Sequence, residues 1–348
     1  MARYKIKLSF FLGLNSIIGD YIETLKPKLW NGYRLIAGDG TTVNLPPSPS
    51  IKNHFGIFNQ TKSGIKTCLA NACILYDVLS NFTLDSMISP VSIGEGSLMN
   101  HMLLKNQWTN SIILLDRGFG YFSTCRLILS RGAGLCIRIK ASQSDFAKKA
   151  FLNPSTDFIT EWTASEAEMA TCKKNNIDYT SFEVRVTKVL LNTGEIELLV
   201  STLLDRAQIS EKAIQELYNL RWGVEEGFKK LKPKMKLEQF GCKRYEGIYQ
   251  EFYAHIFMMN LVEIVAAGAG EIIIKKTKNR KLKYKYNWQN AFRFLRDKFI
   301  DIFHLGEFIR SLEDIIEKIA NSLIAIKDNR TFARNKNKDK SRNTQSYK

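Results

Sequence analysis

Four polar residues with the spacing of one helical stripe are the first candidates for chemistry in this sequence. Tyr218, Arg221, Glu225 and Lys232 stand at offsets of 0, 3, 7 and 14 residues. At about 100° per residue they fall within roughly a 60° arc of a helix. Two cations beside a carboxylate favour its ionised form and can also bind a phosphate. The stripe therefore indicates a site for a metal ion and a nucleic-acid backbone, with a solvated face of helical salt bridges as the alternative.

One long helix over residues 210–240 is expected to carry this stripe. Ser210 can cap its start, and Pro233 should end or kink it just past the last residue of the stripe. Of the two adjacent glutamates, only Glu225 lies on the stripe, because Glu226 is rotated by about 100°. We therefore expect Glu225 to be the functional carboxylate of this helix.

Two aspartates could complete a site with Glu225, because each follows an apolar strand. Asp39 follows the apolar residues 33–38. Asp116 follows the run Ser111–Leu115, which is typical of a strand buried on both faces. Functional groups gather outside the carboxyl ends of strands in an open α/β sheet, so the two carboxylates converge if their strands are neighbours. The alternative for each aspartate alone is a turn former before glycine.

A site of three carboxylates without histidine or cysteine has a defined chemistry. Oxygen-only ligands favour Mg²⁺ or Mn²⁺ over zinc. A pair of such ions can activate a water or a 3′-hydroxyl and stabilise the leaving oxygen in phosphoryl transfer.

The composition favours a polyanionic partner. The chain of 348 residues carries 51 Lys and Arg against 34 Asp and Glu, a net charge of +17. Such a balance indicates nucleic acid first and an acidic membrane surface second. Six scattered cysteines without a CxxC pair, together with four histidines, indicate neither a zinc site nor a disulfide framework. We therefore expect reduced thiols in a cytoplasmic protein, without a signal peptide or a membrane span.

The remaining pattern predicts a mixed α/β framework. Between residues 141 and 205, polar stretches alternate with three strand-like runs, which indicates a β-rich insertion. The elements expected before and after it are a helix over 2–29, loops over 46–49 and 52–66, strands over 68–79, 81–88 and 134–140, helices over 94–104, 121–131, 249–274 and 290–326, and a disordered basic tail over 327–348.

The helix signature and the two aspartate motifs together resemble those of DDE transposases of bacterial insertion sequences, specifically the insertion sequence 4 type. Members carry Tyr, two residues, Arg, three residues, Glu, six residues and Lys, and residues 218–232 match this spacing without a gap. The segments Gly38–Thr41 and Leu115–Phe119 resemble the first and second aspartate motifs. The resemblance extends over about residues 30–255.

The resemblance implies an α/β fold with a ribonuclease-H-like core: three antiparallel strands, then parallel strands and helices. It also implies a β-rich insertion between the second aspartate and the glutamate, with C-terminal helices after the core. By the same resemblance, Asp39, Asp116 and Glu225 would be catalytic and would hold two Mg²⁺ (or Mn²⁺) ions.

The resemblance further implies DNA contacts and partners. Tyr218, Arg221 and Lys232 would contact the phosphate backbone of double-stranded DNA near the transposon end. The implied reaction is cleavage at the element's ends and joining of the freed 3′-hydroxyl to target DNA, by a homodimer in a synaptic complex. The implied location is the bacterial cytoplasm, on the nucleoid when bound to DNA. Some members hold a flipped base with an aromatic in the insertion, but for Trp162 we favour a buried core position.

Two alternatives stay open, because members usually carry a longer helical domain before the first aspartate. One is an N-terminally truncated, catalytically idle DNA-binding relic, and the other is a metal-dependent nuclease on the same fold.

The basic cluster at 275–285 is expected to contact DNA, with a solvated loop as its alternative. The predicted division is a helical remnant of a DNA-binding domain at 1–30, a core at 31–140 and 206–274, the insertion at 141–205, a basic and helical region at 275–326 and the tail at 327–348.

Overall fold

The computed structural model describes residues 5–59, 66–303 and 308–326. The chain forms two compact units, one of residues Glu23–Phe228 and the other of Met1–Ile22 with Lys229–Lys348. The predicted basic tail at 327–348 lies outside the described residues. The domain boundaries inferred from the sequence stay a prediction.

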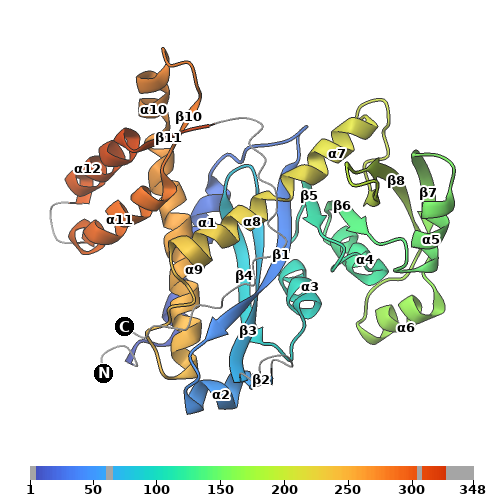
Figure 1. Cartoon of the computed structure of the whole chain (residues 1–348), viewed down its shortest axis with the longest axis horizontal. Helices are drawn as coiled ribbons and strands as arrows, with labels where there is room; N and C mark the ends of the chain where they lie inside the picture. The colour runs from blue at the N-terminus through green and yellow to red at the C-terminus, as the bar shows by residue number, and fades with distance from the viewer. Residues whose placement is uncertain (1–4, 60–65, 304–307, 327–348) are drawn as a thin grey trace. The chain divides into compact units, whose positions relative to one another are not determined.

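A mixed α/β arrangement around one large sheet forms the unit of residues 23–228 (Figure 1). Apolar runs form its central strands, and all five residues of the strand that leads to Asp116 are buried. The strands are β1 (Arg34–Leu45), β2 (Phe58–Asn59), β3 (Lys66–Asp77), β4 (Phe82–Pro90), β5 (Ser111–Leu115), β6 (Gly134–Ile139), β7 (Asp157–Trp162), β8 (Phe182–Leu190) and β9 (Ile196–Ser201).

The sheet has nine strands in the order β2-β3-β1-β5-β6-β9-β8-β7, with β4 paired to β3. Strand β3 is antiparallel to both β1 and β4, while β5 is parallel to β1 and β6 is parallel to β5. Three antiparallel strands followed by parallel ones is the order expected from the sequence. The three strands predicted at 141–205 are present and continue the same sheet, because β9 pairs antiparallel with β6.

The helices of this unit include several that the sequence pattern did not predict. The loops expected at 46–49 and 52–66 contain a helix, which Ser48 caps and which has proline in its first turn. Two further helices lie in the segment 141–205, one of them with a capping box between Ser165 and Glu168. The helices are α2 (Pro49–Phe55), α3 (Glu95–Lys105), α4 (Phe122–Ser130), α5 (Asp145–Leu152), α6 (Glu166–Lys174), α7 (Glu211–Leu220) and α8 (Gly223–Lys229).

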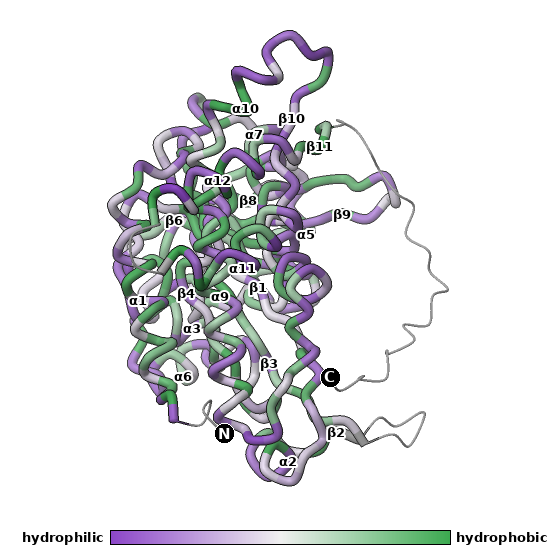
Figure 2. Tube along the Cα trace, turned by 90° about the vertical axis from the view of Figure 1, so that its left-hand side faces the viewer, coloured by the Kyte–Doolittle hydropathy of each residue, from purple (hydrophilic) through white to green (hydrophobic). Residues whose placement is uncertain are grey.

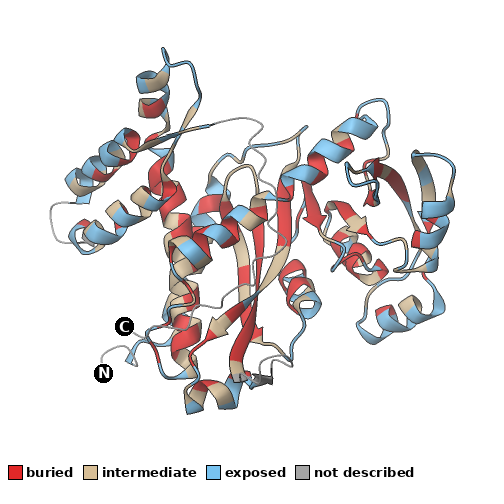
Figure 3. Ribbon diagram, viewed as in Figure 1, coloured by how far each residue is buried: buried red, intermediate tan, exposed pale blue. Residues whose placement is uncertain are grey.

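The core of this unit packs α3 and α4 against the sheet and extends to β7–β9. Buried residues are concentrated along the central strands (Figure 3). Trp162 is 1% exposed and stacks on Phe146, with 4.3 Å between the ring centroids. This burial confirms the core position that we favoured for Trp162, and leaves it no accessible face for a nucleobase.

The single helix expected over 210–240 is wrong in detail. Helix α7 ends at Leu220, a turn follows, and α8 begins at Gly223. A π-helix over Lys230–Lys234 follows in the chain and contains Pro233, which was expected to end the helix. The N–H of Met235 donates to the carbonyl of Lys230, five residues earlier. The wider π-type turn therefore accommodates the proline that an α-helix would exclude.

The unit of residues 1–22 and 229–348 is mainly helical. The helix expected at 249–274 breaks at residues 268–269, and the helix expected at 290–326 is two helices followed by a strand. The two short strands pair antiparallel, and the segment before the first of them is largely hydrophilic (Figure 2). The elements are α1 (Leu8–Thr24), α9 (Tyr245–Ala267), α10 (Gly270–Thr277), β10 (Tyr284–Tyr286), α11 (Trp288–Phe303), α12 (Phe308–Asn321) and β11 (Leu323–Ala325).

A buried carboxylate joins several elements of this second unit. Glu263 on α9 accepts hydrogen bonds from Lys230 Nζ at 2.7 Å, Tyr286 OH at 2.6 Å and Trp288 Nε1 at 2.8 Å. These partners compensate the burial of its charge. Among the described helices none is long and apolar enough to cross a membrane alone, while α9 and α10, bent by 50° at their break, meet the length and composition criteria as a pair.

Candidate active site

The two aspartates lie side by side where neighbouring parallel strands part. Gly38 of β1 is paired with Leu115 of β5, so the next residue in each chain segment is an aspartate. The condition set by the sequence, that these strands be neighbours, is therefore met. Asp39, however, does not end its strand, because β1 continues to Leu45. Asp39 lies beside the point where the neighbouring strand β5 ends. Because Asp39 lies inside a strand, the alternative that it forms a turn before glycine is excluded.

The glycines around Asp39 have a packing role. A Cβ on Gly38 would lie 2.6 Å from the Leu115 side chain and 2.7 Å from Met99 Sδ on α3. A Cβ on Gly40 would lie 2.6 Å from the Glu95 side chain, also on α3. Since successive residues of a strand face opposite sides, close packing against α3 on one face leaves Asp39 pointing to the other.

Two further charged residues, Arg138 and Glu197, lie on the next two strands of the sheet beyond Asp116. Leu115 is paired with Ile137 of β6, so Arg138 follows beside Asp116. In the β6–β9 ladder Arg138 is paired with Leu199, which makes Glu197 its diagonal neighbour on the same face. Sequence reasoning missed both residues, although a charge inside the apolar run 134–139 was a signal for Arg138.

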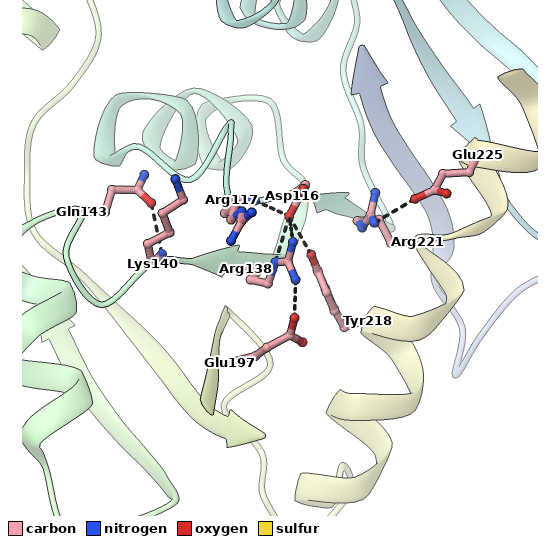
Figure 4. A network of polar contacts seen from close by, with 9 residues as sticks. All are labelled: Asp116, Arg117, Arg138, Lys140, Gln143, Glu197, Tyr218, Arg221 and Glu225. Atoms are coloured by element: carbon pink, nitrogen blue, oxygen red, sulfur yellow. Dashed lines mark hydrogen bonds and ion pairs between the residues drawn. The ribbon is translucent and has the colours of Figure 1, made fainter. Parts of the chain in front are cut away.

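Asp116 has a dense set of hydrogen-bond donors (Figure 4). Its Oδ1 accepts from the N–H of Arg117 at 2.6 Å, from Arg138 Nε at 2.9 Å and Nη2 at 2.7 Å, and from Tyr218 OH at 3.4 Å. Burial alone would raise the pKa of Asp116, but the Arg117 N–H and the charge of Arg138 outweigh it, so the pKa lies below its ordinary value. Asp116 is therefore held as a carboxylate at neutral pH.

Asp39 is held differently. Burial raises its pKa to about 6, and the negative charges of Glu225 and Asp116 add to this increase. A hydrogen bond from the Gly40 N–H at 2.9 Å and the charge of Arg221 act in the opposite direction. Asp39 is therefore near enough to Asp116 and Glu225 for their negative charges to act on it.

The helical part of the site centres on Arg221. This residue and Tyr218 are each only 4% exposed, whereas the side chain of Glu225 is 33% exposed. Arg221 Nη2 lies 3.5 Å from Glu225 Oε1, and the guanidinium carbon lies 5.7 Å from the Tyr218 ring and 5.3 Å from the Trp222 ring. Within the described residues, Arg221 Nε is buried without a hydrogen-bond partner. Burial raises the pKa of Tyr218, so its hydroxyl stays protonated.

The helix break positions these residues. Ser210 caps α7, as predicted, by accepting from the Ala213 N–H at 3.2 Å. Arg221 lies in the turn between α7 and α8, and a Cβ on Gly223 would lie only 3.0 Å from Val78. Helix α8 therefore packs closely against Val78, and this contact helps to fix the position of Glu225 on the helix.

Lys232, the fourth residue of the predicted stripe, lies in the π-helix of the other unit. Its Nζ is 3.6 Å from Glu238 Oε1. The structure thus groups Tyr218, Arg221 and Glu225 with the two aspartates, and the role expected of Lys232 stays a prediction.

The donor chemistry of this site fits a hard divalent cation. In the part of the chain that the structure describes, no group of three or more His, Cys, Asp or Glu residues lies close enough to hold a metal ion. Asp39 and Asp116, which follow paired residues of β1 and β5, and Glu225 on α8 nevertheless supply carboxylate oxygens, the donors that Mg²⁺ and Mn²⁺ prefer. The hydrogen bonds described for Asp116 all end on Oδ1, which leaves Oδ2 for a ligand. A cation would also favour the ionised form of Asp39, which burial and, to a smaller extent, the charges of Glu225 and Asp116 disfavour.

Comparisons with known proteins give a family for this arrangement. Residues 30–261 match the family model described as a transposase DDE domain. No curated protein matches the chain. Among solved structures, the chain is similar to a piggyBac transposase in a synaptic complex with hairpin DNA, with 11% identity and a TM-score of 0.48. That match covers 84% of this chain and 58% of the piggyBac transposase chain. The chain therefore spans less than two thirds of the length of that transposase.

Proposed function

The chain belongs to the transposase DDE domain family, and we propose that it cleaves the ends of a DNA element and joins them to target DNA by phosphoryl transfer. The observation that carries the proposal is the parallel register of β1 and β5, which sets Asp39 beside Asp116. We propose that the strands β1 and β3–β6 form a ribonuclease-H-like core of the insertion sequence 4 type. The order of these strands supports that assignment.

Three residues would hold the divalent ions. Asp39, Asp116 and Glu225 would supply the carboxylate oxygens, and the negative charges of Asp116 and Glu225 both act on Asp39. Two such ions, when bound, activate the attacking hydroxyl and stabilise the leaving oxygen of an in-line displacement. The lowered pKa of Asp116 keeps it ionised for this task, whereas Asp39 is only half ionised at about pH 6 and ionises further as the pH rises.

The basic residues would bind the DNA backbone. Arg221, beside Glu225, would contribute its positive charge to the binding of a phosphate. Tyr218 donates to Asp116 and orients that carboxylate. Lys232 would add a further phosphate contact, a role that rests on the motif alone. The net charge of +17 supports double-stranded DNA as the partner.

The assembly and the location of the protein are part of the same proposal. We propose that the protein acts as a homodimer in a synaptic complex on DNA in the bacterial cytoplasm. Sedimentation of the protein with and without element-end DNA tests this, because a homodimer predicts two protein chains in the complex. One chain per complex would contradict it.

A cleavage assay tests the activity. The substrate is a labelled duplex carrying the sequences that flank the gene, incubated with Mg²⁺ or Mn²⁺. We expect nicks from the wild-type protein and none from Glu225→Gln. Glu226→Gln is the matched control, because this neighbour has the same side chain, is exposed and lies off the stripe. Equal background from wild type and Glu225→Gln would overturn the enzymatic function and favour the idle relic.

A second arm separates a transposase from a nuclease. A labelled target duplex is added to the cleavage reaction, and products that join the two DNAs are resolved on a denaturing gel. A transposase yields joined products that depend on Glu225. Cleavage without joining would indicate a metal-dependent nuclease on this fold.

A further inference from the structure

One guanidinium bridges two carboxylates beside the proposed metal site. Arg138 Nε and Nη2 donate to Asp116 Oδ1 at 2.9 and 2.7 Å, while its Nη1 donates to Glu197 Oε1. Asp116 directly follows β5, Arg138 lies on β6, and Glu197 on β9 is the diagonal neighbour of Arg138. Their side chains are 30%, 22% and 19% exposed for Asp116, Arg138 and Glu197, so each is shielded from bulk water without being fully buried.

The bridge has a consequence for the charge that Asp116 presents. Asp116 with Arg138 alone would be a neutral pair, and a neutral pair attracts a cation weakly. Glu197 adds a second negative charge, which leaves the three side chains with a net charge of −1. It also engages a different nitrogen of the guanidinium from those that donate to Asp116.

We propose that Glu197 is a positioning residue that holds Arg138 and thereby sets the affinity of the Asp116 side of the site for a divalent cation. This inference rests on the proposed function, since it requires a cation at Asp116. In chain order, β9 with Glu197 comes after α6 and before α7, the helix that carries Tyr218. The strand-rich segment 141–205 would then contribute directly to the chemistry of the site through one side chain.

The sign of two substitutions separates this role from a structural one. Glu197→Gln removes a negative charge and should weaken cation binding by roughly 3- to 10-fold. Arg138→Gln removes a positive charge and should strengthen it by a similar factor. If the ion pair only fastened β9 to β6, both substitutions would break the same contact and would change cation binding in the same direction or not at all.

Mn²⁺ binding to the full chain, without DNA, is the test. Free Mn²⁺ is titrated by electron paramagnetic resonance for wild type, Glu197→Gln, Arg138→Gln, Glu225→Gln and the control Glu195→Gln, an exposed glutamate two residues from Glu197. Thermal unfolding of each variant checks that it is folded. If Glu197→Gln does not fold, Glu197→Asp replaces it: the shorter side chain keeps the charge but loosens the contact with Arg138, so a positioning role predicts weaker Mn²⁺ binding, and binding equal to wild type would overturn it.

The outcomes separate this inference from the proposed function. Opposite shifts for Glu197→Gln and Arg138→Gln, with Glu195→Gln unchanged, support it. If wild type binds Mn²⁺, Glu225→Gln weakens binding and Glu197→Gln does not, the inference fails and the proposed metal site stands. If wild type binds no Mn²⁺, both fail.

Discussion

Asp39 and Asp116 occupy adjacent positions on neighbouring strands, and their surroundings act on them in opposite directions. Burial raises the pKa of Asp39 to about 6, with two nearby carboxylates adding to the increase. Burial also acts on Asp116, but a backbone N–H and Arg138 outweigh it and lower the pKa. The two carboxylates thus differ because, within the described part of the chain, only Asp116 of the two accepts hydrogen bonds from an arginine side chain.

Removal of either carboxylate gives the largest expected effect. Asp39→Asn and Asp116→Asn should each lower the rate of element-end cleavage by at least about 10³-fold, because both contribute oxygens to one proposed metal site. The double variant should be no worse than the singles, since residues that act as a unit are not additive. Rates come from the cleavage assay under saturating Mg²⁺.

Asp145→Asn is the control for that prediction. Its side chain is 80% exposed on α5, a helix that carries none of the proposed site residues, and the substitution should leave the rate unchanged. If Asp39→Asn retained near-normal activity while Asp116→Asn did not, the two aspartates would not share one site.

The same pair of substitutions should have opposite effects on stability. The folded-state pKa of Asp39 is raised above 3.8, so its contribution is fully present below about pH 4 and is lost as the pH rises through about 6. At pH 7 the ionised, buried carboxylate is therefore a cost, and Asp39→Asn should raise the free energy of unfolding by about 1 to 3 kcal/mol. For Asp116 the pKa is lowered, so Asp116→Asn should reduce stability at pH 7.

Urea unfolding between pH 4 and pH 7 checks this prediction. The gain from Asp39→Asn should shrink toward pH 4, whereas the loss from Asp116→Asn should stay about constant over this range, because a pKa lowered from 3.8 titrates only below pH 4. If both variants changed the free energy of unfolding in the same direction at pH 7, the two aspartates would not have opposite pKa shifts.

The glycines of the two motifs offer a third comparison. A Cβ on Gly38 would lie 2.6 Å from Leu115, whereas one on Gly118, two residues after Asp116, would meet no atom within 4 Å. Gly38→Ala should therefore lower the free energy of unfolding by about 1 to 3 kcal/mol through overpacking. Gly118→Ala is the control and should change it by less than about 0.5 kcal/mol. Equal losses in urea unfolding would mean that close packing against α3 does not explain the first motif.

The sequence predicted the parts of this site that depend on local pattern. The apolar run Ser111–Leu115 indicated a buried strand, and the periodicity of residues 218–225 indicated a helical stripe, because both signals lie within a few residues. The polar segments that form α2, α5 and α6 were not predicted as helices, since their short cores are completed by residues far away in the chain.

The remaining features depend on tertiary contacts. Nothing in the residues Arg221 and Trp222 is a helix breaker, so the break between α7 and α8 was not predicted; Gly223 packs closely against Val78 at that point. The bridge from Arg138 to Glu197 depends on the register of β6 with β9, which are about 60 residues apart and carry no signal of their pairing in the sequence.

Tyr218 provides the smallest expected effect and the sharpest test of the difference between the aspartates. Its hydroxyl donates to Asp116 Oδ1 over a long 3.4 Å, in addition to the stronger donors Arg117 and Arg138. Tyr218→Phe should therefore lower the free energy of unfolding by only about 0.5 to 1.5 kcal/mol and raise the pKa of Asp116 slightly. The pKa of Asp39 should stay where it is, because the Tyr218 hydroxyl donates to Asp116 and not to Asp39. Carboxyl NMR titrations of wild type and Tyr218→Phe check both values, and an equal shift of the two aspartates would mean that they titrate as one coupled group.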